Sequence, residues 1–210
     1  MKYAALNLVA LAIASLASGC ASQSTDQSIL TPGRIIVLGD SLSVSPTPGE
    51  AFPALLQARL TTRGSAWIVE NAGIRGDTTR GGVNRIDALL ARRPAVLILA
   101  LGANDGLRGL PLAQTRANLD RMIVASKAAG ARVLLVGMRI PPNYGRDYTQ
   151  GFEANYAALA KSRDVPLVPF LLAPIAADRA NFQDDNLHPV AAAQPKIRDH
   201  VWKALDPLLR

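Results

Sequence analysis

The stretch Ala95-Val-Leu-Ile-Leu-Ala-Leu101 is an uninterrupted run of apolar residues, and the polar turn sequence Gly102-Ala-Asn-Asp-Gly106 follows it directly. A continuous apolar run of this length is typical of a parallel β-strand that other elements cover on both faces. The alternative for a short apolar run is a segment of buried helix, but the glycines and polar residues that follow favour a strand end. This stretch therefore predicts a central strand of a parallel sheet.

Weaker strand and helix patterns alternate on both sides of this run. Short apolar runs predict further strands at 34–38, 66–69, 132–136 and 165–168. Apolar residues at helical spacing predict helices over 50–63, 79–92, 112–129, 149–162 and from Pro195 to Leu205. Pro166 interrupts the last of these strands, which we therefore place at a sheet edge. The alternation predicts an α/β fold, a parallel sheet with helices on both faces, without an internal repeat.

The first residues have the composition of an export signal. Lys2 precedes an apolar stretch, 4–17, which is followed by the small residues Ser18 and Gly19. The stretch is shorter than the roughly 20 apolar residues that span a bilayer. The segment Ala17-Ser-Gly-Cys20 resembles the cleavage box of bacterial lipoproteins, although Ala17 stands where Leu is usual. We expect a lipoprotein-type signal over 1–19, a polar tether over 20–32 and a folded domain over 33–210.

Cys20 is the expected site of acylation, so the mature chain would be exported and anchored to a membrane of the bacterial periplasm or cell envelope. Simple export with cleavage near Ala21 is the alternative. Cys20 is the only cysteine in the 210 residues, which excludes an internal disulfide. With one cysteine and two histidines, His188 and His200, a closed zinc site of Cys and His ligands is also excluded, and we expect no metal.

The formal net charge is +7, from 23 Lys and Arg against 16 Asp and Glu. The basic residues are scattered without a run of five, so we expect no nucleic-acid partner. The charge indicates solubility and some attraction to anionic surfaces.

Polar residues follow each expected strand, where parallel α/β sheets bind their ligands. Ser41 follows the first strand in a Gly-Asp-Ser turn and could act as a nucleophile or as an ordinary helix N-cap. Asp185 stands three residues before His188, a spacing that could let a carboxylate orient an imidazole. Asp184 is a second candidate for this role. His200 lies in a helical pattern, and we interpret it as part of a solvated face.

Two further residues could stabilise an oxyanion. Asn104 could direct its side-chain amide into the site, or serve only as a turn residue. Gly76 could offer an unobstructed backbone N–H, or serve only the turn. The Gly-x-Ser-x-Gly elbow of α/β-hydrolases is absent, because Ser43 stands where its second glycine belongs.

Together these segments resemble the four sequence blocks of the SGNH, or GDSL, hydrolase family, in the family's order. The blocks are Gly39-Asp-Ser-Leu-Ser43, Asn71-Ala-Gly-Ile-Arg-Gly-Asp-Thr78, Gly102-Ala-Asn-Asp105 and Asp185-Asn-Leu-His-Pro189. Further stretches resemble the bacterial secreted thioesterase, lysophospholipase and arylesterase subfamily. These are Asn104-Asp-Gly-Leu-Arg-Gly109, Pro142-Asn-Tyr-Gly145, Val165-Pro-Leu-Val-Pro-Phe170 and Gln183-Asp-Asp185.

The resemblance implies a three-layer αβα sandwich, flavodoxin-like, around a five-stranded parallel sheet. It implies Ser41 as nucleophile, Asp185 and His188 as the rest of the catalytic triad, and an oxyanion hole formed by the Ser41 N–H, the Gly76 N–H and the Asn104 amide. The implied activity is hydrolysis of carboxylic esters or thioesters of acyl chains through an acyl-enzyme, without a cofactor.

In this arrangement two loops flank the expected oxyanion hole, at 107–111 and 140–144. Both loops mix apolar residues with Gly or Pro. We therefore expect Leu107 and Ile140 to bind the acyl chain. The loops could instead be plain connectors. The expected partner is a small ester or thioester, and a monomer is the default. Three alternatives remain: a carbohydrate O-acetyl esterase of the same family, a non-catalytic flavodoxin-like surface lipoprotein, and a binding protein whose loop 40–43 cradles phosphate, against which Asp40 argues.

Overall fold

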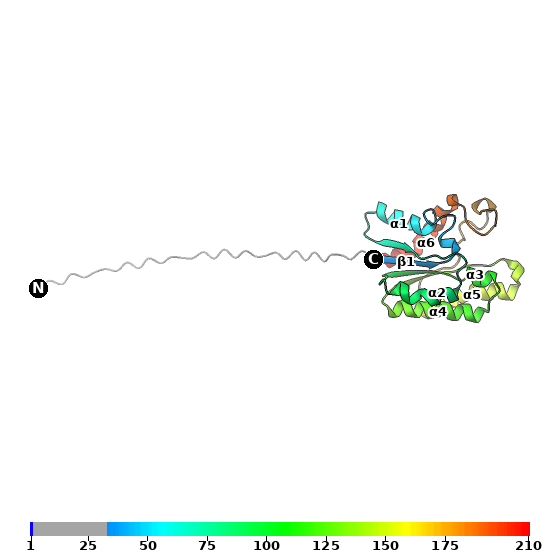
Figure 1. Ribbon diagram of the computed structural model, residues 1–210, viewed down its shortest axis with the longest axis horizontal. Helices are drawn as coiled ribbons and strands as arrows, with labels where there is room; N and C mark the ends of the chain where they lie inside the picture. Colours follow the sequence, from blue (N-terminus) through cyan, green and yellow to red (C-terminus); the bar gives the residue numbers. More distant parts are fainter. Residues whose placement is uncertain (2–32) are drawn as a thin grey trace. The chain divides into compact units, whose positions relative to one another are not determined.

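The computed structural model describes Met1 and residues 33–210, so Cys20 and almost all of the expected leader and tether lie outside the described residues. Residues 33–210 contain a five-stranded parallel sheet with the strand order β2-β1-β3-β4-β5 (Figure 1). The strands are β1 (Arg34–Gly39), β2 (Ile68–Asn71), β3 (Val96–Ala100), β4 (Arg132–Val136) and β5 (Leu167–Val168).

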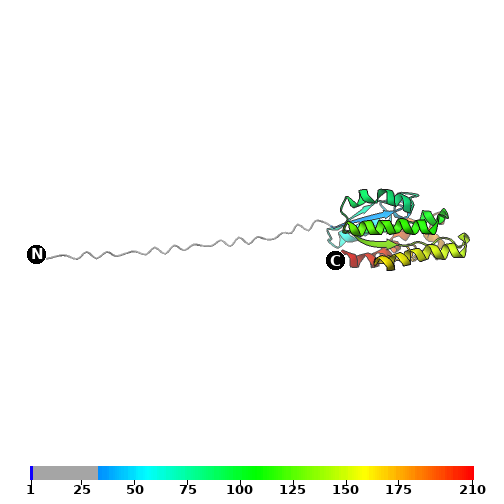
Figure 2. The same cartoon turned by 90° about the horizontal axis from the view of Figure 1, so that it is seen from below.

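Helices cover both faces of this sheet, which confirms the expected α/β sandwich (Figures 1 and 2). The helices are α1 (Phe52–Thr62), α2 (Thr79–Leu90), α3 (Ala103–Leu107), α4 (Leu112–Ala128), α5 (Arg146–Arg163) and α6 (Gln194–Leu205). Helices α1 and α6 pack against each other on one face, while α4 packs between α2 and α5 on the other. Short 3₁₀ turns complete the chain at Ser41–Ser43, Pro142–Tyr144, Arg179–Asn181, Ala191–Ala193 and Asp206–Leu209.

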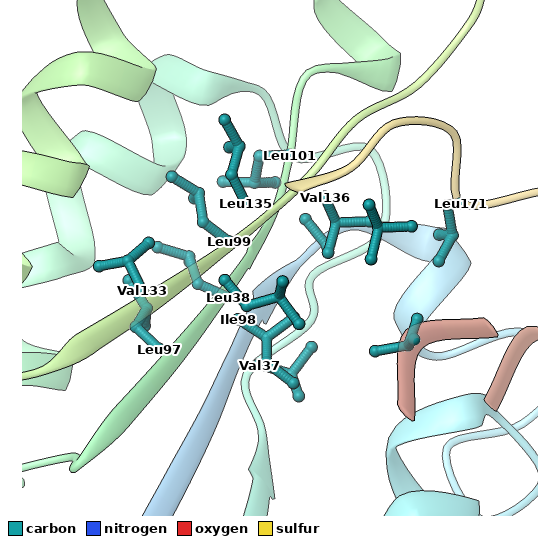
Figure 3. Close-up of a cluster of buried hydrophobic side chains, with 14 of the residues drawn as sticks. Val37, Leu38, Leu97, Ile98, Leu99, Leu101, Val133, Leu135, Val136 and Leu171 are labelled. Atoms are coloured by element: carbon teal, nitrogen blue, oxygen red, sulfur yellow. The ribbon is translucent and has the colours of Figure 1, made fainter. Parts of the chain in front are cut away.

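The core lies on both sides of the central strands because their residues are apolar on both faces. Every residue from Val96 to Leu99 in β3 is fully buried, as is every residue from Ile35 to Leu38 in β1. Figure 3 shows Val37, Ile98 and Val136 from adjacent strands packed together. This burial is what the uninterrupted apolar run around β3 predicted.

The strand order places β1 between β2 and β3, so the connection from β1 to β2 and the connection from β3 to β4 leave the carboxyl ends of these neighbouring strands in opposite directions. In open parallel sheets this reversal opens a crevice outside the carboxyl ends of the strands, where ligands bind. We call this side of the sheet the carboxyl edge and the opposite side, where the strands begin, the amino edge. Ser41 follows the end of β1 directly and therefore lies at the crevice.

Three differences from the sequence-based expectations concern the outer elements. Strand β2 begins at Ile68 rather than at Ala66, and the side chain of Gln57 accepts the Val69 N–H at 2.6 Å beside this edge strand. Helix α5 begins at Arg146 rather than at 149. Helix α3 was not predicted, because Asn, Asp and Gly within five residues are typical of a turn rather than of a helix. In the described part of the chain, no helix combines the length and apolarity that crossing a bilayer needs.

Candidate active site

Ser41 begins a 3₁₀ turn directly after β1, and the residue before it caps this turn. The Oδ1 atom of Asp40 accepts the Leu42 N–H at 3.0 Å, so Asp40, not Ser41, is the N-cap. The Ser41 Oγ atom instead lies 2.8 Å from Nε2 of His188. The turn fits tightly against β1, because a Cβ atom on Gly39 would lie 2.0 Å from Oγ of Ser43. The sequence alternative of Ser41 as a helix cap is therefore wrong.

The loop after β5 brings His188 and Asp185 together. Nδ1 of His188 lies 2.6 Å from Oδ2 of Asp185, while Oδ1 of Asp185 accepts the backbone N–H groups of Leu187 and His188 at 2.9 Å each. Asn186 adopts a left-handed conformation, φ 57°, which turns the chain between the two side chains. The carboxylate thus holds both the backbone and the ring of His188.

Asp185 is ionised at neutral pH. Burial opposes its ionisation, but the hydrogen bonds from the His188 side chain and from the backbone N–H groups of His188 and Leu187 lower its pKa to about 2. A carboxylate at this position accepts a hydrogen bond from Nδ1–H, so the lone pair of the neutral imidazole lies on Nε2 and faces Ser41. In this arrangement Ser41 can donate its hydroxyl proton to the imidazole.

Two glutamines join the loop of His188 to the loop of Ser41. Gln183 donates its side-chain amide to the Ser45 hydroxyl at 2.9 Å and to the Pro189 carbonyl at 3.0 Å. Gln194, fully buried at the start of α6, donates to the Ser45 carbonyl at 2.8 Å and accepts the Phe52 N–H at 2.9 Å. These bonds fix the relative position of two loops that are distant in the sequence. Sequence analysis assigned no role to either glutamine.

Asn104 and Gly76 lie beside the same turn. The Asn104 amide donates to the carbonyl of Asp77 at 2.9 Å and more weakly to Oδ2 of Asp40 at 3.4 Å. Asp77 follows Gly76 directly, and Asp40 precedes Ser41, so the three residues expected to donate to an oxyanion converge. Gly76 has φ 73°, a conformation that favours glycine, and its carbonyl accepts a hydrogen bond from Arg108 at 2.9 Å.

Two more charged residues hold these loops, and neither was found from the sequence. Arg85 in α2 donates to the carbonyls of Gly39 and Ala72 and to the carboxylate of Asp77. Asp105, which is 1% exposed, accepts the Thr79 N–H at 2.8 Å and the Thr79 hydroxyl. Asp105 thereby fixes α3, and with it Asn104, against the start of α2. A single polar residue in a helical pattern, such as Arg85, or in a turn sequence, such as Asp105, carries no sequence signal for such long-range bonds.

Asp40 is a buried carboxyl group directly beside this site. Burial raises its pKa to about 6, although the Leu42 N–H and the nearby His188 favour the ionised form. The nearby carboxylates of Asp77 and Asp105 also raise this pKa.

A cavity of about 360 Å³ borders the site. Leu107 and Ile140 both line it, as do Ala103 next to Asn104 and Leu187 next to His188. Most other lining side chains are apolar, including Met138, Phe170, Leu172 and Phe182. Gly106 lets Ile140 approach α3, because a Cβ atom on Gly106 would lie 2.5 Å from Cγ2 of Ile140. The two residues expected to bind an acyl chain therefore share one apolar cavity.

Within residues 33–210, the remaining candidates, Asp184 and His200, make no hydrogen bond to the triad. The backbone carbonyl of Asp184 accepts a hydrogen bond from Arg179, and Asp184 is exposed to solvent. His200 is half-buried, with Nε2 3.0 Å from the Phe170 carbonyl, so the interpretation of His200 as part of a solvated face is wrong. No group of three or more His, Cys, Asp or Glu side chains suited to a metal ion occurs within residues 33–210.

A parallel αβα fold that brings Ser, His and Asp into one hydrogen-bonded row at its carboxyl edge is typical of serine hydrolases. The comparisons with known proteins are more specific. The profile of the GDSL-like Lipase/Acylhydrolase family matches residues 37–194. The chain is 41% identical over 197 residues to the protein named Esterase TesA of Pseudomonas aeruginosa, which covers 92% of this chain and 98% of that protein.

One further protein and one solved structure are similar over most of the domain. The Thioesterase 1/protease 1/lysophospholipase L1 of Escherichia coli is 42% identical over 178 residues, which is 83% of this chain and 84% of that protein. The crystal structure of TesA superposes with a TM-score of 0.80 at 43% identity and covers 83% of this chain and 99% of that chain. The chain therefore belongs to the GDSL-like lipase/acylhydrolase family and is a hydrolase of ester bonds.

Proposed function

We propose that this chain is a serine esterase that hydrolyses carboxylic esters or thioesters of apolar acyl chains. The observation that carries the proposal is the row of hydrogen bonds from Asp185 through His188 to Ser41, beside an apolar cavity. In this proposal Ser41 is the nucleophile, His188 the general base and Asp185 the residue that orients His188.

The proposed reaction proceeds through an acyl-enzyme. Nε2 of His188 takes the hydroxyl proton as Oγ of Ser41 attacks the acyl carbonyl, and the backbone N–H groups of Ser41 and Gly76 and the amide of Asn104 stabilise the oxyanion. The C–O or C–S bond then breaks, and the leaving alcohol or thiol takes the proton from His188. Water repeats these steps on the acyl-enzyme and releases the acid. The row of residues needs no cofactor for this chemistry.

The cavity supports an acyl chain as the group that is bound. Its walls around Leu107 and Ile140 offer apolar contacts and few hydrogen bonds, which suits a hydrocarbon chain better than a sugar. The names of the relatives, esterase and thioesterase/lysophospholipase, agree with this substrate class. A carbohydrate O-acetyl esterase is the second candidate, because such an enzyme would use the same row of residues.

A fluorophosphonate probe tests the nucleophile directly. The probe should form a covalent bond to Ser41, detected by peptide mass spectrometry, and the Ser41→Ala variant should not react. Ser43, whose buried side chain has no hydrogen-bond partner among the described residues, offers a matched control, since Ser43→Ala should still react. Labelling at another serine would refute the assignment of Ser41.

Export is proposed on the sequence alone, since residues 2–32 lie outside the described structure. In this proposal a lipoprotein-type signal over 1–19 is removed and Cys20 becomes an acylated N-terminus in the periplasm or cell envelope. Mass spectrometry of the purified mature chain should detect an acylated Cys20. An unmodified N-terminus at Ala21 or Ser22 would refute acylation and would leave export intact.

A further inference from the structure

The charged residues of the domain are distributed unevenly between its two edges. We count the amino edge as the first residue of each strand, the last turn of each long helix and the segments between them: 33–34, 59–68, 87–96, 125–132, 160–167 and 202–210. These ranges contain eleven Lys or Arg residues and only three acids. The basic residues are Arg34, Arg59, Arg63, Arg92, Arg93, Lys127, Arg132, Lys161, Arg163, Lys203 and Arg210.

The carboxyl edge, counted in the same way, lacks this excess. Its ranges are 39–55, 71–82, 100–115, 136–149 and 168–197, and they contain seven Lys or Arg against eight Asp or Glu. The positive charge of the described domain is therefore concentrated on the edge opposite to the candidate active site. An anionic surface would attract the amino edge and would not attract the carboxyl edge.

Helix stability does not account for this distribution. Cations in the last turns of helices complement the helix dipole, which explains Arg59, Lys127, Lys161, Arg163 and Lys203 individually. It does not explain Arg34 and Arg132, which begin strands, or Arg210 at the end of the chain. Ion pairs neutralise the edge only in part. Glu70 is shared by Arg34 and Arg92, Asp206 is shared by Arg63 and Arg210, and Arg59 and Arg163 pair with Asp199 and Asp120. Within residues 33–210 this leaves Arg93, Lys127, Lys161 and Lys203 without a carboxylate partner, and four acids serve the six paired arginines.

The same edge carries both tryptophans of the chain. Trp67 and Trp202 line a hollow of about 330 Å³ together with Leu209, and Arg63 and Arg210 line it too. The guanidinium of Arg63 lies 4.7 Å from the centre of the Trp202 ring, and that of Arg132 lies 5.8 Å from the Trp67 ring. Tryptophan beside arginine is a composition typical of the headgroup region of membranes, where an apolar ring and a cation both find partners.

We infer that the amino edge is a docking surface for an anionic lipid bilayer, with the catalytic edge facing the water. Charge complementarity argues for this partner, and so does the path of the chain, because Gly33 begins the domain at this edge, thirteen residues after Cys20. An extended segment of that length reaches about 45 Å at most, so a membrane anchor at Cys20 would hold the amino edge near the bilayer. The docking surface itself does not depend on acylation.

This orientation affects which substrates reach Ser41. The crevice of the active site would open toward the aqueous phase, and not toward the lipids on which the enzyme rests. Esters dissolved in water would then reach the site freely while the enzyme remains on the membrane.

Vesicle binding tests the inference on the full chain carrying Cys20→Ser, which removes the expected acylation. At low salt, the Cys20→Ser chain should co-sediment with vesicles of phosphatidylcholine that contain about one third phosphatidylglycerol. It should not co-sediment with vesicles of pure phosphatidylcholine. The tested variant is Arg93→Glu/Lys161→Glu/Lys203→Glu, because these three exposed side chains make no ion pair or hydrogen bond within residues 33–210. We expect its partition coefficient to fall at least about 30-fold.

A matched control separates the position of the charges from their number. Arg80→Glu/Arg116→Glu/Arg121→Glu changes the net charge equally at exposed positions on α2 and α4, away from the amino edge. It should retain binding within about threefold. Equal losses in both variants would show that only net charge matters and would overturn the docking surface. Binding of a DNA duplex but not of vesicles would assign the edge to nucleic acid instead.

The tryptophans report the orientation, since both lie at the amino edge. Brominated phosphatidylglycerol should quench their fluorescence on binding, and the hydrolysis of a soluble p-nitrophenyl ester should stay within about twofold on saturating vesicles. Vesicle binding without quenching, or with loss of this hydrolysis, would place another face on the membrane and would overturn the proposed orientation.

Discussion

The carboxylate of Asp40 accepts a hydrogen bond from the side-chain amide of Asn104 at 3.4 Å, although 64 residues separate the two in the sequence. This bond joins the turn that carries Ser41 to helix α3. It is long, whereas the bond from the same amide to the Asp77 carbonyl is 2.9 Å. An oxyanion beside Ser41 could therefore replace Asp40 as the acceptor at little cost, because a charge-assisted bond of ordinary length is stronger than the present bond of 3.4 Å.

We expect Asn104→Ala to lower kcat for ester hydrolysis by about 10²–10³-fold with little change in KM, because the amide bonds the oxyanion mainly in the transition state. Steady-state kinetics on p-nitrophenyl esters measure both constants. A change in KM alone would show that Asn104 binds the ground-state substrate. Circular dichroism should confirm that the variant is folded, because Asn104 also holds the Asp77 turn.

Asp40 should make the stability of the domain depend on pH. Its pKa is raised to about 6 in the fold from an ordinary value of 3.8, so between these pH values the folded state holds a proton that the unfolded chain has lost. The free energy of unfolding should accordingly decrease as pH rises from 4 to 6. Asp40→Asn should remove up to about 3 kcal/mol of this decrease, measured by urea unfolding at pH 4 and pH 7. Parallel pH profiles for the variant and the parent would contradict this prediction.

Ser41→Ala and His188→Ala should each lower kcat/KM by at least about 10³-fold, and the double variant should be little worse than either, because the two residues act as one unit. Thermal unfolding should show that the fold is retained, since the Ser41 side chain is bonded only to His188 within residues 33–210. Additive losses, or a Ser41→Ala variant that keeps most of its kcat, would refute the shared role.

Asp185→Ala should reduce kcat by less than either of those substitutions and by more than Asp184→Ala. Asp185 bonds the His188 ring, whereas within residues 33–210 Asp184 only accepts a hydrogen bond from Arg179 through its backbone carbonyl. Asp184→Ala is therefore the matched control, one residue away and equally charged. The reverse order of the two effects would make Asp184 the residue that orients His188.

The cavity should select longer acyl chains. Each buried methylene contributes up to about 0.8 kcal/mol, so kcat/KM on p-nitrophenyl esters should rise from acetate to at least hexanoate. Leu107→Ala and Ile140→Ala should flatten this rise and preserve acetate hydrolysis. Leu208→Ala, a half-buried leucine at the amino edge, is the control and should leave the rise unchanged. If acetate is the best substrate and none of these variants matters, the carbohydrate O-acetyl esterase becomes the better hypothesis.

The sequence by itself determined the α/β class, the central position of β3 and the placement of polar residues at the strand ends. These features are local: a run of apolar residues such as 95–101 must be buried on both faces, and a proline such as Pro166 cannot donate to an inner strand. The four ordered blocks around Ser41, Gly76, Asn104 and His188 indicated the family, because each block has a fixed composition that can be read without the fold.

Only the tertiary structure decided which of these residues meet, and through which contacts. The bonds of Gln183 and Gln194 to Ser45, of Arg85 to the carbonyl of Gly39 and of Asp105 to Thr79 join segments far apart in the chain. The short helix α3 forms against the local preference for a turn, and the bonds of Asp105 to Thr79 hold it against the start of α2. The basic residues of the amino edge are likewise scattered along the sequence. The parallel topology brings the helix ends and strand starts to one side of the sheet, and this places these residues together. Hydrogen bonds and charges act through space, and chain order alone does not specify the distances on which they depend.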